Sequence, residues 1–142
     1  MKIVILGAGQ AALQTALSLR QGHFDGDIDI VGNEPFLPYQ RPPLSKAYLK
    51  GALERERLFL KPQEFFDEHN ITLHLAQQVS AIDKEAKRIS GDNGFALDYD
   101  RLVLATGSRP RRLDLPGRDL ENIFDLCLSA FPFECFILAH FE

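Results

Sequence analysis

Short apolar runs alternate with an amphipathic stretch at the start of the chain. Residues 3–6 read Ile-Val-Ile-Leu, a continuous apolar run that is typical of a buried parallel strand. Residues 10–21 carry small and apolar side chains at three- and four-residue spacing, which predicts a helix that ends before Gly22. Residues 28–31 read Ile-Asp-Ile-Val, a second run that is mostly apolar. The pattern therefore predicts a strand, a helix and a second strand in succession.

The pattern then becomes irregular. Four prolines lie within residues 35–43, and because proline fixes its own backbone and lacks an N–H group, they predict an extended loop. Residues 44–51 predict a short helix closed by glycine. Residues 54–57, Glu-Arg-Glu-Arg, are expected to be a solvated face. Residues 62–69 predict another short helix, opened by a proline near its first position.

The stretch from residue 71 onward is rich in predicted strands. Two segments, at 71–75 and 79–82, alternate apolar and polar residues, and residues 87–90 and 95–99 are further short strand candidates joined by a turn. Residues 102–105 are again continuously apolar, as expected of a buried parallel strand. We therefore expect an α/β fold, a Rossmann-like βαβ half-domain with a parallel sheet and a small antiparallel β segment.

The turn between the first strand and the first helix carries the chemistry. Residues 7–12 read Gly-Ala-Gly-Gln-Ala-Ala, a G-x-G-x-x-A pattern. Gly7 permits a tight exit from the strand, Gly9 permits close approach to a pyrophosphate, and Ala12 lets the helix pack on the strand. An acidic residue follows roughly twenty positions later, at Glu34. A strand-to-helix turn with chance glycines is the alternative, and the context favours dinucleotide binding.

Composition narrows the class of protein. The 142 residues suffice for one domain, and a net charge of −4 speaks against a nucleic-acid-binding surface. No apolar run approaches the ~20 residues of a membrane helix, and a strand that begins at residue 2 leaves no room for a signal peptide. Cys127 and Cys135 fit no metal or redox spacing, and the four histidines suggest no metal site. We expect a cytoplasmic protein.

A longer pattern of motifs resembles a known family. Residues 37–46 read Leu-Pro-Tyr-Gln-Arg-Pro-Pro-Leu-Ser-Lys, and together with 7–12, 31–34 and 97–107 they resemble the flavoprotein ferredoxin reductases of the putidaredoxin- and rhodocoxin-reductase type. Those enzymes use FAD to pass electrons from NADH to a small iron–sulfur protein. The likeness runs from residue 2 to about 126, and the Arg-Pro-Pro-Leu-Ser-Lys block carries most of its specificity.

The resemblance implies roles for individual residues. Backbone contacts to the FAD pyrophosphate would come from the glycine turn, and contacts to the adenosine ribose from the end of the second strand. The implied residues are Gly7, Gly9, Ala11 and Ala12 for the pyrophosphate, and Asn33 or Glu34 for the ribose. Many relatives have Asp where this chain has Asn33, so Glu34 is the alternative ribose contact.

The remaining implied residues lie further along the chain. Arg41 would lie along the adenosine and phosphates, and Lys46 would approach the isoalloxazine, where a cation stabilises reduced anionic flavin. Val79 would meet adenine, and the cleft would be lined by Ala105, Thr106 and Gly107. For Arg41 and Lys46 the alternative is an ordinary surface cation. Residues 35–48 lack a redox cysteine pair, so the acceptor would be a one-electron protein or oxygen.

The chain also lacks features of the complete family. No second glycine fingerprint for NADH follows the first, so residues 1–126 are expected to be the N-terminal part of a truncated FAD-binding domain. Residues 127–142 form an atypical, phenylalanine-rich tail, for which we expect a frameshift or truncation near residue 127; a true tail is the alternative.

The sequence is therefore compatible with three functions. The leading one is the FAD-binding portion of an NAD(P)H-dependent ferredoxin reductase, inactive by itself. The alternatives are an inactive nucleotide-binding half-domain and a fragment of a rubredoxin or nitrite reductase.

Overall fold

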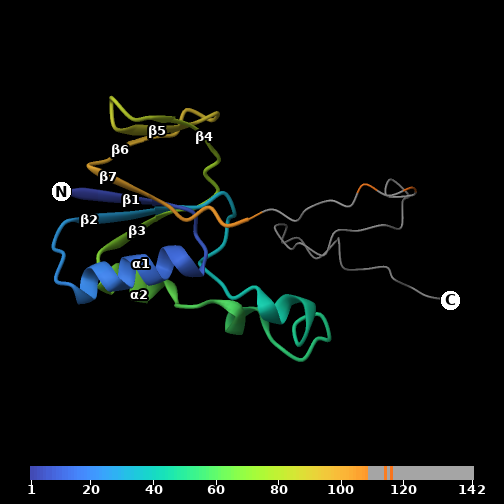
Figure 1. The fold of residues 1–142 in the computed structure, drawn as a ribbon. Coiled ribbons are helices and arrows are strands. Elements are labelled where there is room, and N and C mark those ends of the chain that lie inside the picture. Colours follow the sequence, from blue (N-terminus) through green and yellow to red (C-terminus); the bar gives the residue numbers. More distant parts are fainter. Residues whose placement is uncertain (109–113, 115, 117–142) are drawn as a thin grey trace.

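The structure is a computed structural model that describes residues 1–108, Asp114 and Pro116 (Figure 1). The predictions for the tail at residues 127–142 lie outside the described residues.

A four-stranded parallel sheet forms the centre of the molecule. Its strands are β1 (Lys2–Leu6), β2 (Asp27–Val31), β3 (Ile71–His74) and β7 (Arg101–Leu104), in the order β3-β2-β1-β7. Leu6 at the end of β1 pairs with Val31 of β2 and with Leu104 of β7. The carboxyl ends of the strands therefore meet along one edge, where ligands bind in open α/β sheets.

Both faces of the sheet are covered. The helices α1 (Gln10–Gln21) and α2 (Gln63–Glu68) lie on one face, and the antiparallel strands β4 (Val79–Asp83), β5 (Arg88–Gly91) and β6 (Ala96–Asp98) lie over the other (Figure 1). Ile3 and Ile5 face the helices, whereas Val4 between them packs with Ile89 of β5. Successive side chains of β1 thus enter opposite cores, which explains why its sequence is apolar over residues 3–6.

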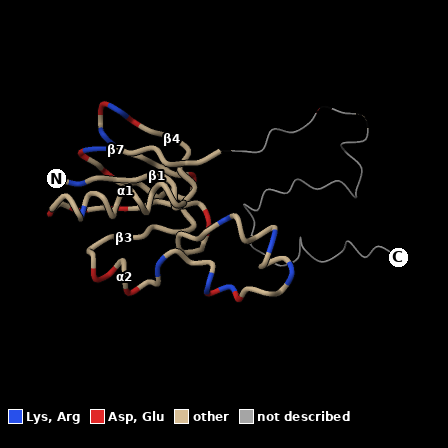
Figure 2. The backbone as a smooth tube through the Cα atoms, turned by 60° about the horizontal axis from the view of Figure 1, so that its bottom comes forward, with Lys and Arg blue, Asp and Glu red and all other residues tan. Residues whose placement is uncertain are grey.

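A third cluster lies outside the main sheet. The excursion, defined as residues 36–60, contains the 3₁₀ turns η1 (Pro42–Ser45) and η2 (Arg55–Leu58) and packs on its own buried side chains Tyr39, Leu44 and Leu58. Figure 2 shows cations and anions interspersed along it. The solvated face predicted for residues 54–57 is confirmed, because all four residues are exposed.

The helix predicted for residues 44–51 is wrong. Only a single 3₁₀ turn forms, at Pro42–Ser45, and hydrogen-bonded turns continue to Gly51. Two adjacent prolines at the start of this turn provide no N–H groups, and Lys46 leaves it with φ −128° and ψ −104°, outside the helical region.

The other predicted elements agree with the structure to within one or two residues. The strand expected at residues 71–75 is β3 and joins the parallel sheet beside β2, whereas the next three short strands form the antiparallel sheet. The helix expected over residues 62–69 is α2, with Pro62 preceding it and His69 following it.

One arginine ties three segments together. The Arg20 guanidinium, at the end of α1, donates to the carbonyl oxygens of Phe24 and Gly26 in the loop before β2. It also donates to the carbonyls of His69 and Asn70, before β3, at 2.8 and 2.7 Å. A planar guanidinium with five N–H donors suits this task, because lysine cannot reach so many acceptors in a fixed fork.

Replacing Arg20 is expected to destabilise the fold. Arg20→Ala leaves four carbonyls without their donor, and hydrogen bonds from charged donors are worth about 1.5–3 kcal/mol each. Because water can replace some of the lost donors at these carbonyls, we expect the free energy of unfolding to fall by only about 2–4 kcal/mol, measured by urea denaturation. Arg57→Ala, at an exposed site, is the control and should change stability by less than about 0.5 kcal/mol. Equal effects of the two variants would contradict the role of Arg20.

An exposed ion pair links β5 to β6. Arg88 and Asp98 are directly opposite one another, with Arg88 Nε 2.5 Å from Asp98 Oδ1 and Nη2 3.0 Å from Oδ2. The hydrogen bond from Arg88, assisted by its charge, lowers the pKa of Asp98 below the ordinary value, even though desolvation opposes the shift. Because the folded pKa is depressed, the pair stabilises the fold above the unfolded pKa of Asp98, and this contribution is lost as pH falls through the folded pKa.

The pKa of Asp98 therefore depends on Arg88. In Arg88→Gln we expect the carboxyl titration of Asp98, followed by NMR, to move upward toward the ordinary value of about 3.9. Arg57→Gln should leave it unchanged. An unshifted Asp98 in Arg88→Gln would show that the cross-strand pair does not persist in solution.

Candidate dinucleotide-binding site

The turn after β1 is held against the end of β7. Gly7 has φ +116°, and its N–H donates to the Val31 carbonyl at 2.7 Å. A Cβ at this position would lie 2.1 Å from the Ala105 carbonyl oxygen, which is a severe overlap. Ala105 in turn donates its N–H to the Leu6 carbonyl at 2.7 Å. Glycine is therefore required at position 7 both by backbone conformation and by space.

The second glycine stands in open space. Gly9 precedes α1 with φ −95°, and no atom lies within 4 Å of the position that a Cβ would occupy. No side chain caps the N-terminus of α1, and its first turn contains no acidic residue. The first N–H groups of a helix have no partner within it, and they carry the positive end of the helix dipole. The arrangement can therefore accept an anion.

Small residues set the distance between α1 and the sheet. Ala12 is fully buried in the main core, whereas the preceding Ala11 is exposed. The role expected for Ala12, close packing of the helix on the strand, agrees with this burial.

A third glycine, Gly32, packs against the turn and had no role in the sequence prediction. A Cβ on Gly32, directly after β2, would lie 2.5 Å from the Cβ of Ala8. Its N–H donates to the His74 carbonyl, and its own carbonyl accepts from Gln77. The sequence feature that could have indicated this role is the position of Gly32 directly after the strand at residues 28–31.

The end of β2 is linked to the excursion. The Glu34 carboxylate, 12% exposed, accepts from Arg41 Nη2 at 3.1 Å and from the Tyr39 hydroxyl at 2.6 Å. The guanidinium of Arg41 also lies 5.5 Å from the Tyr39 ring centroid. Asn33 is exposed. The structure therefore brings Glu34 and Arg41 together, a contact that the sequence did not predict.

The other expected site residues occupy three places. Lys46 is exposed at the end of η1, and no hydrogen bond or ion pair joins it to the glycine turn within the described residues. Val79 begins β4 and packs against the cluster under the antiparallel sheet. The segment 105–107 directly follows β7, with Ala105 half-buried and Thr106 and Gly107 exposed beside the turn.

A buried carboxylate was missed by sequence reasoning. Asp29, in the middle of β2, is 4% exposed and faces the antiparallel sheet. His74 Nε2 lies 2.6 Å from its Oδ1, and Lys2 Nζ lies 3.4 Å from its Oδ2. These partners compensate the burial of the carboxylate. His74, expected to be a surface or half-buried residue, is half-buried.

The described residues contain neither a candidate metal cluster nor a candidate membrane helix. Within residues 1–108 no cluster of three or more His, Cys, Asp or Glu residues could hold a metal ion. None of the helices in the described part of the chain is long and apolar enough to cross a membrane.

Comparison with known proteins gives consistent matches. A family model described as pyridine nucleotide-disulphide oxidoreductase matches residues 1–130. The chain is 50% identical over 123 residues to rhodocoxin reductase from Rhodococcus erythropolis, covering 87% of this chain and 29% of that protein. It therefore spans less than a third of that relative.

Two solved structures are also similar. A ferredoxin reductase from Rhodopseudomonas palustris matches with a TM-score of 0.78 and 43% identity, over 86% of this chain and 30% of that one. The reductase in a covalent putidaredoxin reductase–putidaredoxin complex matches with a TM-score of 0.75 and 43% identity, over 80% of this chain and 27% of that one.

The two glycines of the turn should respond differently to a methyl group. Gly7→Ala combines a positive φ with overlap on a backbone carbonyl, so we expect a loss above about 3 kcal/mol or failure to fold. Gly9→Ala, with a permitted φ and free space, should change stability by less than about 1 kcal/mol. Thermal unfolding followed by circular dichroism measures both. Similar melting temperatures for the two variants would contradict the described turn.

Proposed function

Because the chain belongs to the pyridine nucleotide-disulphide oxidoreductase family, we propose that residues 1–126 are the FAD-binding portion of an NAD(P)H-dependent ferredoxin reductase. The observation that carries this proposal is the open backbone at Gly9, next to the uncapped N-terminus of α1. It lies at the edge of the parallel sheet where the strands end. A pyrophosphate fits such a place, since both backbone donors and the helix dipole favour negative charge.

The residues around the turn support the rest of a dinucleotide. Gly7, Gly9, Ala11 and Ala12 would hold the pyrophosphate by backbone contact. The exposed amide of Asn33 can accept hydrogen bonds from ribose hydroxyls, and the Glu34 carboxylate retains acceptor capacity beyond its two present donors.

The remaining contacts would come from three other segments. Val79 would meet adenine, and the walls of the cleft would be Ala105, Thr106 and Gly107, which are joined to the turn through the Ala105 hydrogen bond. Arg41 pairs with Glu34 close to the end of β2 and would lie along the phosphates. Lys46 would approach the isoalloxazine, where its positive charge would stabilise anionic reduced flavin.

The proposed chemistry belongs to the flavin. Bound FAD would accept a hydride from NADH and release single electrons. The electron acceptor we propose is a ferredoxin-type iron–sulfur protein, since similar reductases act with such partners and one was solved with putidaredoxin. A preference for FAD over NAD as the resident ligand rests on the segment 37–46 and the small antiparallel sheet. We place the protein in the cytoplasm.

The second function that we propose is an inactive nucleotide-binding half-domain. The chain spans 29% of rhodocoxin reductase, and the described residues include the glycine turn and the parallel sheet that such a half-domain would use. In this proposal residues 127–142 are an atypical tail outside the domain.

FAD binding is the direct test. Titration of flavin fluorescence with the purified 142-residue chain should show saturable quenching, and NAD⁺ should bind at least about tenfold more weakly. Gly9→Ala should weaken FAD binding at least about tenfold because the methyl group stands where the pyrophosphate would lie. Gly22→Ala, at the opposite end of α1, is the matched control. Absence of quenching, or tighter binding of NAD⁺, would refute the FAD assignment.

Turnover tests an expectation that the two functions share. In either function the chain alone should not reduce an iron–sulfur ferredoxin or a dye with NADH, and NADH-dependent reduction by this chain would contradict both. If reduction is observed, a preference for rubredoxin over ferredoxin would identify a rubredoxin reductase.

A further inference from the structure

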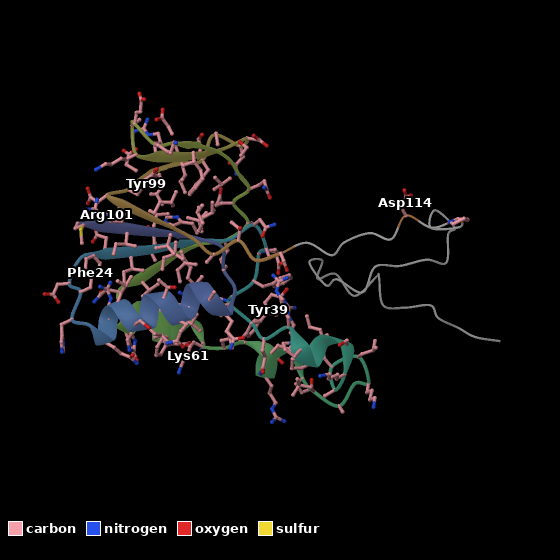
Figure 3. The ribbon with its side chains drawn as sticks, in the orientation of Figure 1. Phe24, Tyr39, Lys61, Tyr99, Arg101 and Asp114 are labelled. Carbon is pink, nitrogen blue, oxygen red and sulfur yellow. The ribbon has the colours of Figure 1, made fainter. Side chains whose placement is uncertain are left out.

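A buried tyrosine lies where the excursion leaves the sheet (Figure 3). Tyr39 is 5% exposed and packs with Leu44 and Leu58 in the core of the excursion. Its backbone pairs with Phe59 in an antiparallel bridge, and hydrogen bonds on both sides of it join residues 38 and 40 to residues 60 and 58. The ring therefore has a fixed position that its neighbours determine.

The hydroxyl and the ring of this tyrosine contact two charged residues. Its hydroxyl donates to Glu34 Oε2 at 2.6 Å, and its ring lies 5.5 Å from the Arg41 guanidinium. Glu34 and Arg41 also contact one another, with Nη2 3.1 Å from Oε1. Each of the three side chains thus contacts the other two. The Glu34 backbone is anchored as well, because its carbonyl accepts from the Ala76 N–H.

The three side chains of this triad differ in solvent exposure. Tyr39 is buried and Glu34 is 12% exposed, whereas the side chain of Arg41 is 51% exposed. An exposed arginine normally samples many rotamers, and ordering it on ligand binding costs conformational entropy. Here the carboxylate and an aromatic face already contact it without ligand, and Tyr39 supplies the aromatic face and donates a hydrogen bond to the carboxylate. Restriction before binding raises affinity.

We propose that Tyr39 is a positioning residue that holds Glu34 and Arg41 in place for the anionic part of a dinucleotide. The ligand in this proposal rests on the proposed function; the ordering of Arg41 does not. Glu34 engages one nitrogen of a guanidinium that carries five N–H donors, so Arg41 can bind a phosphate while the pair persists. In this proposal both the tyrosine and the arginine of the segment 37–46 have a role in the site.

The ordering of Arg41 is tested without ligand. In ¹⁵N relaxation of the Arg41 side chain, the Nε–Hε order parameter should be high in the wild type and fall in Tyr39→Phe, which keeps the ring and removes the hydroxyl. Glu34→Gln should lower it as well, which keeps the test valid if one variant folds poorly. Tyr99→Phe is the matched control, because it removes a hydroxyl that donates to the Asp83 carbonyl, away from this triad. An unchanged order parameter in folded Tyr39→Phe would overturn the proposal.

The consequence for the ligand is tested with FAD. Tyr39→Phe should weaken FAD binding about tenfold, as expected for loss of one hydrogen bond to a charged group, while Tyr99→Phe should leave it unchanged. The double variant Tyr39→Phe/Glu34→Gln should bind FAD as Glu34→Gln does, because Tyr39 acts through Glu34. Unchanged or tighter binding by Tyr39→Phe would overturn this part. If the wild type fails to bind FAD, the proposed function fails, and the relaxation experiment still decides whether Tyr39 orders Arg41.

Discussion

The close approach of Gly7 to the Ala105 carbonyl is the constraint on which the site depends. β1 lies between β2 and β7, and the turn after it must pass the ends of both neighbours. Gly7 donates to Val31 on one side and has no room for a side chain on the other, where a Cβ would be 2.1 Å from Ala105. Only because the chain turns so tightly here does α1 begin directly above the sheet edge, with Gly9 in open space.

Covering both faces of the sheet has a cost that the structure meets locally. The central strands β1 and β2 are buried on both sides, so a polar side chain in the middle of β2 must find its partners inside. Asp29 does so with His74 from β3 and Lys2 from β1, two strands that flank it. The charged residue is therefore compatible with a continuous strand, and its partners lie on the face opposite to α1.

Much of the fold could be predicted because its signals are local. The glycine turn, α1 and the apolar strands each follow from a pattern within about a dozen residues. The helix expected over 44–51 from its closing glycine does not form, because the chain makes a single 3₁₀ turn at Pro42–Ser45 and leaves the helical region at Lys46. The Glu34–Arg41–Tyr39 triad and the Asp29–His74 pair could not be predicted, since each depends on how separate segments pack.

The candidate site draws on two parts of the molecule that have separate buried clusters. Its backbone donors belong to the β1–α1 turn, which the main core holds, whereas Arg41 and Lys46 belong to the excursion, which has its own buried cluster. The backbone donors would recognise a pyrophosphate, a group that both FAD and NAD contain. Discrimination between the two would then have to come from side chains beyond the turn. Through Glu34, the end of β2 is joined to Arg41, so in our proposal the triad couples the part that would recognise any dinucleotide to the part that would distinguish one from another.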